Sequence, residues 1–279
     1  MTTQYVAELG FARRMAIIAG DLTQAHFRKG GNNQRRKPDG TIVTRADIAV
    51  NTVIAQMVRN ERPGERWLGE EDDTHDWGTG DDPTDRVWVC DPNDGSGLNA
   101  AGVPINLFAL ALVEGGKPVL GVVHDSHTGT TYHAVVGGKA YWTNSRGASG
   151  ELQVNRTSNL GEGKTALFGM TVGAYDTVGL TRELLARGGT TFNTNSAVYN
   201  GLTVAMGYTV AAILPFNSPW DAAPLLPIIA GAGGKVTDLK GHWQRYDQRI
   251  NGMLATNGSV HNQAVSVIGQ CQAYNVDDL

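Results

Sequence analysis

Two aspartates stand three positions apart, directly after an apolar run in the first half of the chain. Residues 88–98 read WVCDPNDGSGL, so Asp91 and Asp94 follow the run VWVC with Asn93 between them. Two carboxylates on one tight loop repel each other unless a cation lies between them, and such hard oxygen ligands suit Mg²⁺ or Ca²⁺ better than Zn²⁺. The spacing therefore predicts a divalent-metal site at the end of a buried strand. The alternative is a purely structural Asp-rich turn.

The segment Gly95-Ser96-Gly97 adds a second kind of chemistry. No bulky side chain covers its backbone N–H groups, and a helix that started here would turn them into an anion site beside the metal. A cation next to an anion site is the apparatus of phosphoryl transfer, because the cation neutralises phosphate oxygens and activates water. The combination predicts metal-assisted chemistry on a phosphate group.

The first half of the chain must supply the elements that hold these groups. Apolar positions at helical spacing predict an amphipathic helix over residues 4–28, and a second helix opens at Asp47. KPDGT at 37–41 is a turn signal. Short apolar runs separated by the glycine pairs 115–116 and 137–138 then predict the hairpins of an antiparallel sheet.

After residue 150, strands and helices alternate, which predicts an α/β half packed beside the earlier sheet. The strands expected there are TALFGM (165–170), TVAAILP (209–215) and KVTDL (235–239). The helices expected there are TRELLAR (181–187), NSAVYNGLTVAMG (195–207) and PWDAAPLLPIIAGAGG (219–234). Pro224 is expected near the start of the last helix, and Pro227 is expected to kink it or to mark a shorter helix.

The composition describes one globular unit. The chain has 279 residues, 41% of them hydrophobic and 18% charged, and single units of this size are ordinary. A net charge of −4 gives no electrostatic footprint for a nucleic acid polymer or an anionic membrane, so neither is expected as a partner. Glu8, Arg13 and Arg14 interrupt the N-terminus, which argues against a signal peptide. Cys90 and Cys271 form no CxxC motif, and the cytoplasm is the expected location.

Four stretches resemble the inositol monophosphatase family, within the wider group of lithium-sensitive, magnesium-dependent phosphatases. WVCDPNDGSG is similar to the family signature W-x-x-D-P-x-D-G-[ST], and LGEE at 68–71 resembles its G-E-E metal loop. DGTIVTRAD at 39–47 resembles the V-T-x-x-D segment, and residues 219–238 resemble the W-D-x-A-A…A-G-G-x-x-x-D segment. The resemblance extends over roughly residues 37–265 and includes the middle hairpins.

The resemblance implies a role for each matching position. Side-chain metal ligands are expected at Glu70, Asp91, Asp94 and Asp221, with the carbonyl of Asn93 as a backbone ligand. Asp47 and Ser96 match the pair that orients and deprotonates the attacking water, and Glu70 belongs to the same catalytic set. Phosphate and substrate contacts are expected from Gly95, Ser96, Gly97, Asn195, Ser196 and Ala197.

The same resemblance implies a fold and a reaction. The expected fold is α+β or α/β, a layered αβαβα sandwich of the inositol monophosphatase and fructose-1,6-bisphosphatase type. It forms a single catalytic unit over 1–279, with an N-terminal lobe at 1–150, a C-terminal lobe at 151–279 and the active site between them. The expected reaction is Mg²⁺-dependent hydrolysis of a small phosphomonoester by a metal-activated water, without a phosphoenzyme and with two or three ions per site. A homodimer and inhibition by Li⁺ are also implied.

The sequence departs from the family pattern where the substrate is concerned. Leu98 and Asn99 stand where asparagine and phenylalanine are usual. Val210 and Leu214 stand where the family carries acids that grip substrate hydroxyls, so a polyol would lose hydrogen bonds. Sugar phosphate, inositol phosphate, histidinol phosphate and a 3′-phosphorylated nucleotide remain open as substrates, with inositol phosphate disfavoured. The alternative function is a catalytically weak or inactive family member that binds a phosphorylated metabolite.

Two other motifs are assigned no role. His124, His127 and His133 could suggest a zinc site, but a hairpin carrying exposed histidines explains them better. GEGKT at 161–165 echoes a phosphate loop. However, Ser158 stands where that motif needs glycine, and a strand is expected to follow rather than a helix.

Overall fold

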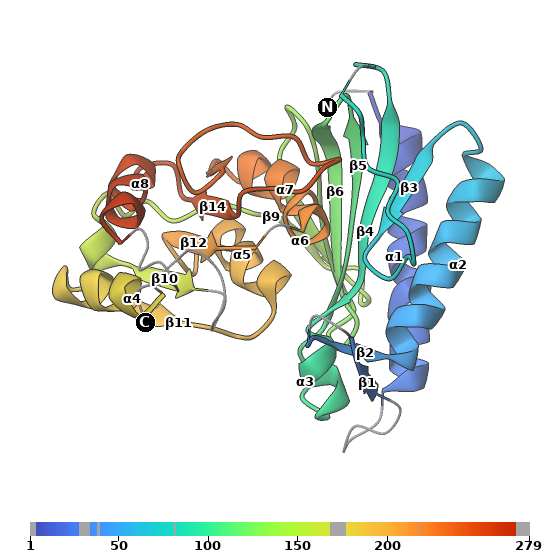
Figure 1. The fold of residues 1–279 in the computed structure, drawn as a ribbon, viewed down its shortest axis with the longest axis horizontal. Coiled ribbons are helices and arrows are strands. Elements are labelled where there is room, and N and C mark those ends of the chain that lie inside the picture. The colour runs from blue at the N-terminus through green and yellow to red at the C-terminus, as the bar shows by residue number, and fades with distance from the viewer. Residues whose placement is uncertain are drawn as a thin grey trace.

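The protein is built in five layers, α–β–α–β–α, in a computed structural model that describes residues 4–27, 34–37, 40–80, 82–167, 177–216 and 218–271 (Figure 1). A seven-stranded and a five-stranded sheet are the two β layers. Two long helices cover the outer face of the larger sheet, further helices lie between the sheets, and two helices cover the outer face of the smaller sheet. The layered sandwich predicted from the sequence is confirmed.

The larger sheet follows the order of the chain. Its strands are β3 (Arg66–Gly69), β4 (Arg86–Asp94), β5 (Leu107–Glu114), β6 (Lys117–Asp125), β7 (Thr130–Val135), β8 (Tyr141–Asn144) and β9 (Ser149–Glu151). Neighbours run antiparallel except β3 and β4, which pair in parallel. Gly115 and Gly116, both with positive φ, connect β5 to β6, and Gly137 lies between β7 and β8. The hairpins expected at both glycine pairs are therefore confirmed.

Helices α1 (Val6–His26) and α2 (Arg45–Glu61) pack side by side on this sheet (Figure 1). On α1 the fully buried Ala12, Met15 and Ala19 recur every three or four residues, as an amphipathic helix requires. Both N-terminal helices expected from the apolar spacing are thus present.

Three short elements lie at one end of the larger sheet. The ribbon of β1 (Gln34–Arg36) and β2 (Ile42–Thr44) precedes α2, and α3 (Ser96–Ala100) follows β4 and contacts β2. After β9 the chain leaves the larger sheet, passes through the 3₁₀ turn η1 (Leu160–Glu162) and enters the smaller sheet.

The smaller sheet mixes parallel and antiparallel pairs. Its order is β11 (Thr190–Phe192), β10 (Lys164–Leu167), β12 (Ala211–Leu214), β14 (Met253–Thr256) and β13 (Lys235–Thr237). Strand β10 is parallel to both neighbours, whereas β14 is antiparallel to both. Helices α4 (Thr177–Ala186) and α8 (His261–Gln270) cover its outer face. The strand expected at 165–170 is found up to Leu167, and its last three residues lie outside the described part of the chain.

The layer between the sheets corrects one prediction. Its helices are α5 (Ala197–Ala205), α6 (Pro219–Ala222) and α7 (Leu225–Gly231). A single helix was expected over 219–234, but the chain breaks between α6 and α7 at Pro224. A Cβ built on Gly121 of β6 would lie 2.0 Å from the carbonyl oxygen of Pro224, so the break rests directly on the larger sheet. Pro227 falls in the first turn of α7, where the missing N–H costs no helical hydrogen bond.

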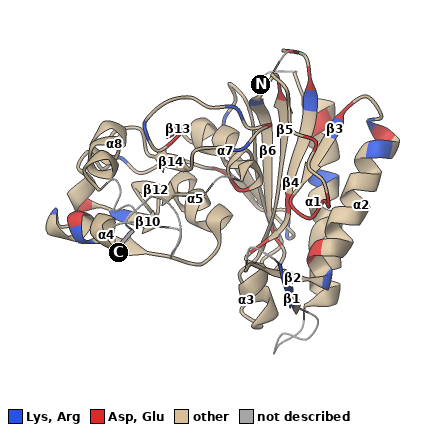
Figure 2. Ribbon diagram, viewed as in Figure 1, with Lys and Arg blue, Asp and Glu red and all other residues tan. Residues whose placement is uncertain are grey.

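Charge is spread over the surface elements. In the view of Figure 2, Lys and Arg occur on α1, α2, α4 and the connecting loops, and the described residues seen there form no continuous basic stripe. None of the described helices combines the length and the apolar character that crossing a membrane requires.

Candidate active site

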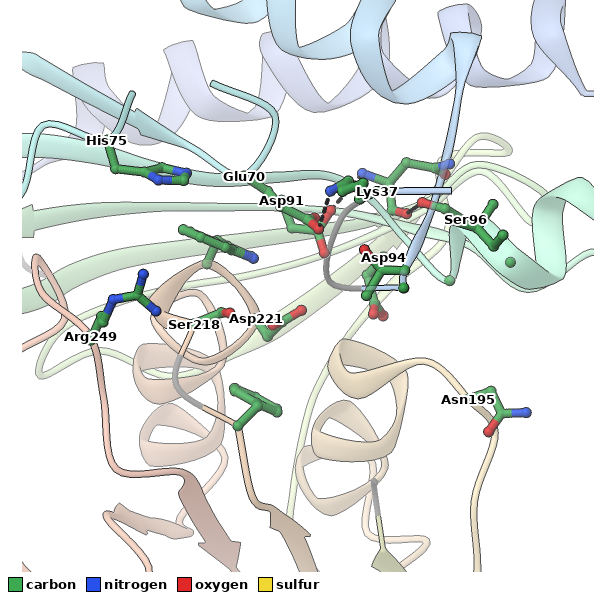
Figure 3. A pocket seen from close by; sticks show the side chains of 18 residues that line it. Lys37, Glu70, His75, Asp91, Asp94, Ser96, Asn195, Ser218, Asp221 and Arg249 are labelled. Atoms are coloured by element: carbon green, nitrogen blue, oxygen red, sulfur yellow. Dashed lines mark hydrogen bonds and ion pairs between the residues drawn. The ribbon is translucent and has the colours of Figure 1, made fainter. Parts of the chain in front are cut away.

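The carboxylates predicted as metal ligands converge at the end of β4. Asp91, Asp94 and Asp221 each offer an oxygen, and these oxygens all lie within 4.8 Å of one another. Asp91 and Asp94 flank a shift in the pairing register of β4 with β5, and Asp221 lies in the first turn of α6. The irregular strand end and the helix therefore bring together residues that are distant in the sequence (Figure 3).

Burial and mutual repulsion oppose the charge on this cluster. Burial raises the pKa of Asp91 well above its ordinary value, and the carboxylates of Glu70 and Asp221 raise it further. The pKa of Asp221 is raised in the same way, by burial and by Asp94. For Asp94, burial outweighs the hydrogen bonds that it accepts and raises the pKa to about 6. Since a cation would relieve this repulsion and the donors are all oxygens, the residues present fit a hard divalent cation.

Glu70, the fourth predicted side-chain ligand, lies in the same cavity but is held by a lysine. The Nζ atom of Lys37 lies 2.9 Å from Oε1 of Glu70 and 2.5 Å from Oε1 of Glu71 (Figure 3). Burial opposes the charge on Lys37, but the two carboxylates together raise its pKa above the ordinary value. On Glu71, burial and Glu70 outweigh the ammonium and raise the pKa to about 7. Sequence reasoning missed Lys37, because residues 37–41 signal only a turn.

Asp47 and Ser96, the pair expected to act on water, are in direct contact. The Oγ atom of Ser96 donates to Oδ1 of Asp47 and lies 2.7 Å from the carbonyl oxygen of Asn93. Asp47 is the third residue of α2, and its Oδ2 accepts a 2.9 Å hydrogen bond from the backbone N–H of Thr44 within a capping box. The start of the helix therefore fixes the carboxylate, and burial raises its pKa.

Asp94 also holds the beginning of α5. Its carboxylate accepts 3.0 Å hydrogen bonds from the backbone N–H groups of Ala197 and Val198, and one from Oγ of Ser196. Ser196 and Ala197 are buried and do not line the cavity. These two residues, expected to contact substrate, are instead occupied in fixing a carboxylate of the larger sheet.

The remaining predicted residues surround one cavity of about 680 Å³. Its lining includes all the predicted metal ligands together with Gly95, Ser96, Gly97 and Asn195. Gly95 has a φ of 90°, and a Cβ there would lie 2.8 Å from the carbonyl oxygen of Ile105, so the position requires glycine. The backbone can approach a bound group closely at this end of the cavity.

Val210 and Leu214, where acids are missing, do not line the cavity. Val210 is 1% exposed and packs in the core outside the smaller sheet, and Leu214 is fully buried in the core between the sheets. The chain between β12 and α6 contributes Phe216 and Ser218 to the lining instead. These two residues, which sequence reasoning did not single out, are what a substrate meets on that side.

His75, Trp220 and Arg249 line the cavity, and Figure 3 shows His75 and Arg249 on the side away from Asn195. The rings of His75 and Trp220 are stacked, with centroids 5.1 Å apart, and Trp77 lies 6.2 Å from Trp220. The guanidinium of Arg249 lies 5.5 Å from the ring centroid of Trp77. We call His75, Trp77, Trp220 and Arg249 the ring wall. Of its members only Trp220 could be singled out from the sequence, because they come from three separate segments.

The two motifs that were set aside do not form sites in the described structure. The ring nitrogens Nδ1 of His124 and His133 are hydrogen-bonded to Oγ1 of Thr131 and to the carbonyl of Tyr141. Within the described ranges, the one group of three possible ligands that converges is the aspartate cluster. The GEGKT segment forms η1 and β10, without the helix that a phosphate loop opens.

Comparison with known proteins places the chain among phosphatases. The family model described as the inositol monophosphatase family matches residues 6–273. A histidinol-phosphatase of Chlorobaculum parvum is 28% identical over 94% of this chain and 96% of its own. A fructose-1,6-bisphosphatase/inositol-1-monophosphatase of Thermotoga maritima is 27% identical over 94% of this chain and 96% of its own.

A solved structure agrees with these sequence matches. The inositol monophosphatase (IMPase) structure from Thermotoga maritima superposes with a TM-score of 0.81 at 27% identity, and the match covers 95% of this chain and 98% of that one. The resemblance drawn from the sequence motifs is therefore confirmed. The chain belongs to the inositol monophosphatase family and is a phosphatase, a hydrolase that acts on phosphate esters.

Proposed function

We propose that the chain hydrolyses a small phosphomonoester in a Mg²⁺-dependent reaction, with water as the nucleophile. The observation that carries this proposal is the meeting of two sets of groups in one region. The carboxylates of the buried Asp91 and Asp94 and of the partly buried Asp221 converge within 4.8 Å. The Asp47–Ser96 pair lies beside them on the Asn93 carbonyl. A purely structural Asp-rich turn would account for the converging carboxylates, but it would not require the Asp47–Ser96 pair beside them.

The cation would be held by the side chains of Asp91, Asp94, Asp221 and Glu70 and by the carbonyl of Asn93. When bound, Mg²⁺ supplies charge neutralisation to the phosphate oxygens and acidity to water. Glu70 becomes available when Lys37 gives up its 2.9 Å ion pair. The raised pKa values of the three aspartates support a cation at this place, since they mark carboxylates that lack a counter-charge.

The Asp47–Ser96 pair is suited to take a proton from water. Oγ of Ser96 has one hydrogen and two oxygen neighbours, on Asp47 and Asn93, so its lone pairs accept from a water on the cavity side. Burial makes Asp47 more basic than an exposed aspartate, so a proton passed through Ser96 can rest on its Oδ1. The helix start that fixes Asp47 keeps this relay in place during the reaction.

The phosphate would lie against the backbone of Gly95, Ser96 and Gly97. Gly97 is exposed and a Cβ there would meet nothing within 4 Å, so this backbone is open to the cavity. N–H groups in the first turn of a helix have no intrahelical acceptor and favour an anion. The lining of this end of the cavity supports phosphate binding here.

The wider organisation follows from family membership as a set of proposals. The segments 1–150 and 151–279 would act as two lobes of a single catalytic unit, with Asn195 as a further substrate contact. A homodimer, a cytoplasmic location, two or three Mg²⁺ ions per site and inhibition by Li⁺ belong to the same set. The relatives are named for histidinol phosphate, inositol phosphate and fructose 1,6-bisphosphate, which supports a small phosphorylated metabolite as substrate.

Phosphate release from a panel of monophosphates tests the proposal. The panel holds sugar, inositol, amino-alcohol and nucleotide monophosphates, each assayed with Mg²⁺ and with chelator. We expect Mg²⁺-dependent release that is lost in Asp221→Asn and kept in Asp73→Asn, because Asp73 is exposed. Tight Mg²⁺ binding without release from any compound would contradict hydrolysis and favour a protein that only binds a phosphorylated metabolite.

A further inference from the structure

The cavity extends beyond the groups that the proposed hydrolysis uses. In Figure 3, His75 and Arg249 lie to one side of the carboxylates, and Ser96 and Asn195 lie to the other. All four residues line the same cavity of about 680 Å³. A phosphate held at Gly95 and Ser96 would leave the side of the ring wall for the rest of the substrate.

Arg249 brings an uncompensated positive charge to that side. Its side chain has no hydrogen bond and no ion pair with any residue in the described part of the chain, and its guanidinium lies over the ring of Trp77, 5.5 Å from the ring centroid. By contrast, Lys37, which also lines the cavity, is neutralised by Glu70 and Glu71. A guanidinium that lies on an aromatic face keeps its N–H edges available for a planar anion.

His75 carries an unsatisfied polar atom in the same wall. Its Nε2 is buried and finds no hydrogen-bond partner among the described residues. The stacked Trp220, 5.1 Å away between centroids, holds the imidazole plane in place. A buried nitrogen without a hydrogen-bond partner destabilises the folded protein. A polar group of a ligand bound beside His75 would supply that partner.

We propose that Arg249 and His75 determine specificity, by binding an anionic group that the leaving alcohol of the substrate carries. That group is a carboxylate or a second phosphate. The inference rests on the proposed phosphomonoesterase function and names the class of substrate: a phosphomonoester with a second negative charge on its alcohol part.

The charges of the cavity favour an anion over a cation at the ring wall. Metal ions at Asp91, Asp94 and Asp221 would neutralise those carboxylates, and Lys37 keeps Glu71 as a partner when Glu70 binds metal. Among the described residues that line the cavity, Arg249 is then the cation without an ion-pair partner. An ammonium group on the alcohol part would be repelled by this guanidinium. A substrate whose alcohol part is a neutral flat ring can also pack on Trp220. If the protein preferred such a substrate to one with an anionic group, the ring wall would have a purely aromatic role.

Matched substrate pairs test the preference for an anionic alcohol part. The first pair is 3-phosphoglycerate and glycerol 3-phosphate, which differ by a carboxylate. The second pair is fructose 1,6-bisphosphate and fructose 1-phosphate, which differ by a phosphate. We expect the wild-type protein to favour the anionic member of at least one pair by about tenfold or more in kcat/KM, since charge-assisted contacts are worth that much. The pair with the larger ratio of kcat/KM shows whether Arg249 and His75 bind a carboxylate or a second phosphate.

Substitution of Arg249 then tests the residue. In Arg249→Gln we expect the preference to fall to about twofold or less, because kcat/KM falls for the anionic substrate and stays the same for the neutral one. Arg249→Lys should keep part of the preference. His75→Gln is expected to reduce the same ratio by a smaller factor. Arg182→Gln, at an exposed arginine on α4, is the matched control and should leave the ratio unchanged. An equal loss for both members of a pair, an unchanged ratio, or a wild-type preference for the neutral member or for histidinol phosphate would each overturn the proposal.

A binding measurement keeps this test apart from the test of hydrolysis. Titration calorimetry of the Mg²⁺-loaded protein with 3-phosphoglycerate and with glycerol 3-phosphate needs no turnover. If nothing is hydrolysed but Arg249→Gln removes a tenfold or larger difference in affinity, the proposed function fails and the specificity assignment stands. If hydrolysis is Mg²⁺-dependent but the two affinities are equal in both proteins, the specificity assignment fails alone.

Discussion

Asp221→Asn is expected to stabilise the metal-free protein while it removes activity. Two unit charges separated by 4.8 Å, the limit within which the cluster's oxygens lie, repel by about 3 kcal/mol at an effective dielectric constant of about 20. The substitution removes the repulsion of Asp221 with Asp91 and with Asp94. Because the cluster relieves part of this by taking up protons, we expect a gain of about 1–3 kcal/mol in the free energy of unfolding in chelator. For a chain of this length, that raises Tm by about 2–5 °C.

Thermal and urea unfolding, each with chelator and with excess Mg²⁺, measure this effect. The wild-type protein should gain stability from Mg²⁺ by mass action, and Asp221→Asn should gain much less. Asp247→Asn is the control, since Asp247 is a fully buried aspartate that pairs with Arg245, whose Nε lies 3.0 Å from its Oδ1. That variant should lose about 3 kcal/mol in both conditions. If Asp221→Asn destabilised the metal-free protein as Asp247→Asn does, the cluster would not be a site of stored repulsion and the argument for a cation would be refuted.

Three further predictions address the relay, the packing and the acid response. Ser96→Ala should lower kcat by about 10²-fold without changing the affinity for Mg²⁺ measured by calorimetry, and Ser96→Thr should restore the rate. Gly121→Ala should cost about 2–3 kcal/mol in urea unfolding, because its Cβ would lie 2.0 Å from the carbonyl oxygen of Pro224, whereas Gly10→Ala meets nothing within 4 Å and should not destabilise. Burial lowers the pKa of His261 from 6.5 to about 4. As the pH falls from 6.5 to 4, His261 therefore binds a proton in the unfolded chain before it does so in the folded protein. The free energy of unfolding should fall by about 2 kcal/mol over this range, and by less in His261→Gln.

Residues that act through neighbours in the sequence could be predicted from the sequence. Asp91 and Asp94 share one strand end, and Asp47 lies at a helix start that the preceding threonine caps. Their residue types and spacing already specify the local geometry. The layered fold could also be predicted, because apolar periodicity and glycine turns are local signals and the family motifs occur in order.

Residues whose partners are distant could not be predicted in the same way. Ser196 meets Asp94 across 102 positions, and the sequence around it indicates only the start of a helix. The ring wall joins His75, Trp220 and Arg249 from separate segments, and of these only the segment of Trp220 carries a recognisable motif, which does not indicate the other two residues. The break at Pro224 depends on how closely the chain approaches Gly121, which is a property of packing between layers.

The three hydrogen bonds from the start of α5 to Asp94 tie a charged group of one sheet to the scaffold of the other. An engineer who replaced this aspartate to change the preferred cation would also uncap a buried helix. Metal preference at this position therefore cannot be redesigned independently of folding. Arg249 makes no hydrogen bond or ion pair within the described residues, so replacing it disturbs no structural contact of that kind. If it selects the alcohol part as proposed, laboratory evolution can alter that selectivity at a smaller cost in stability.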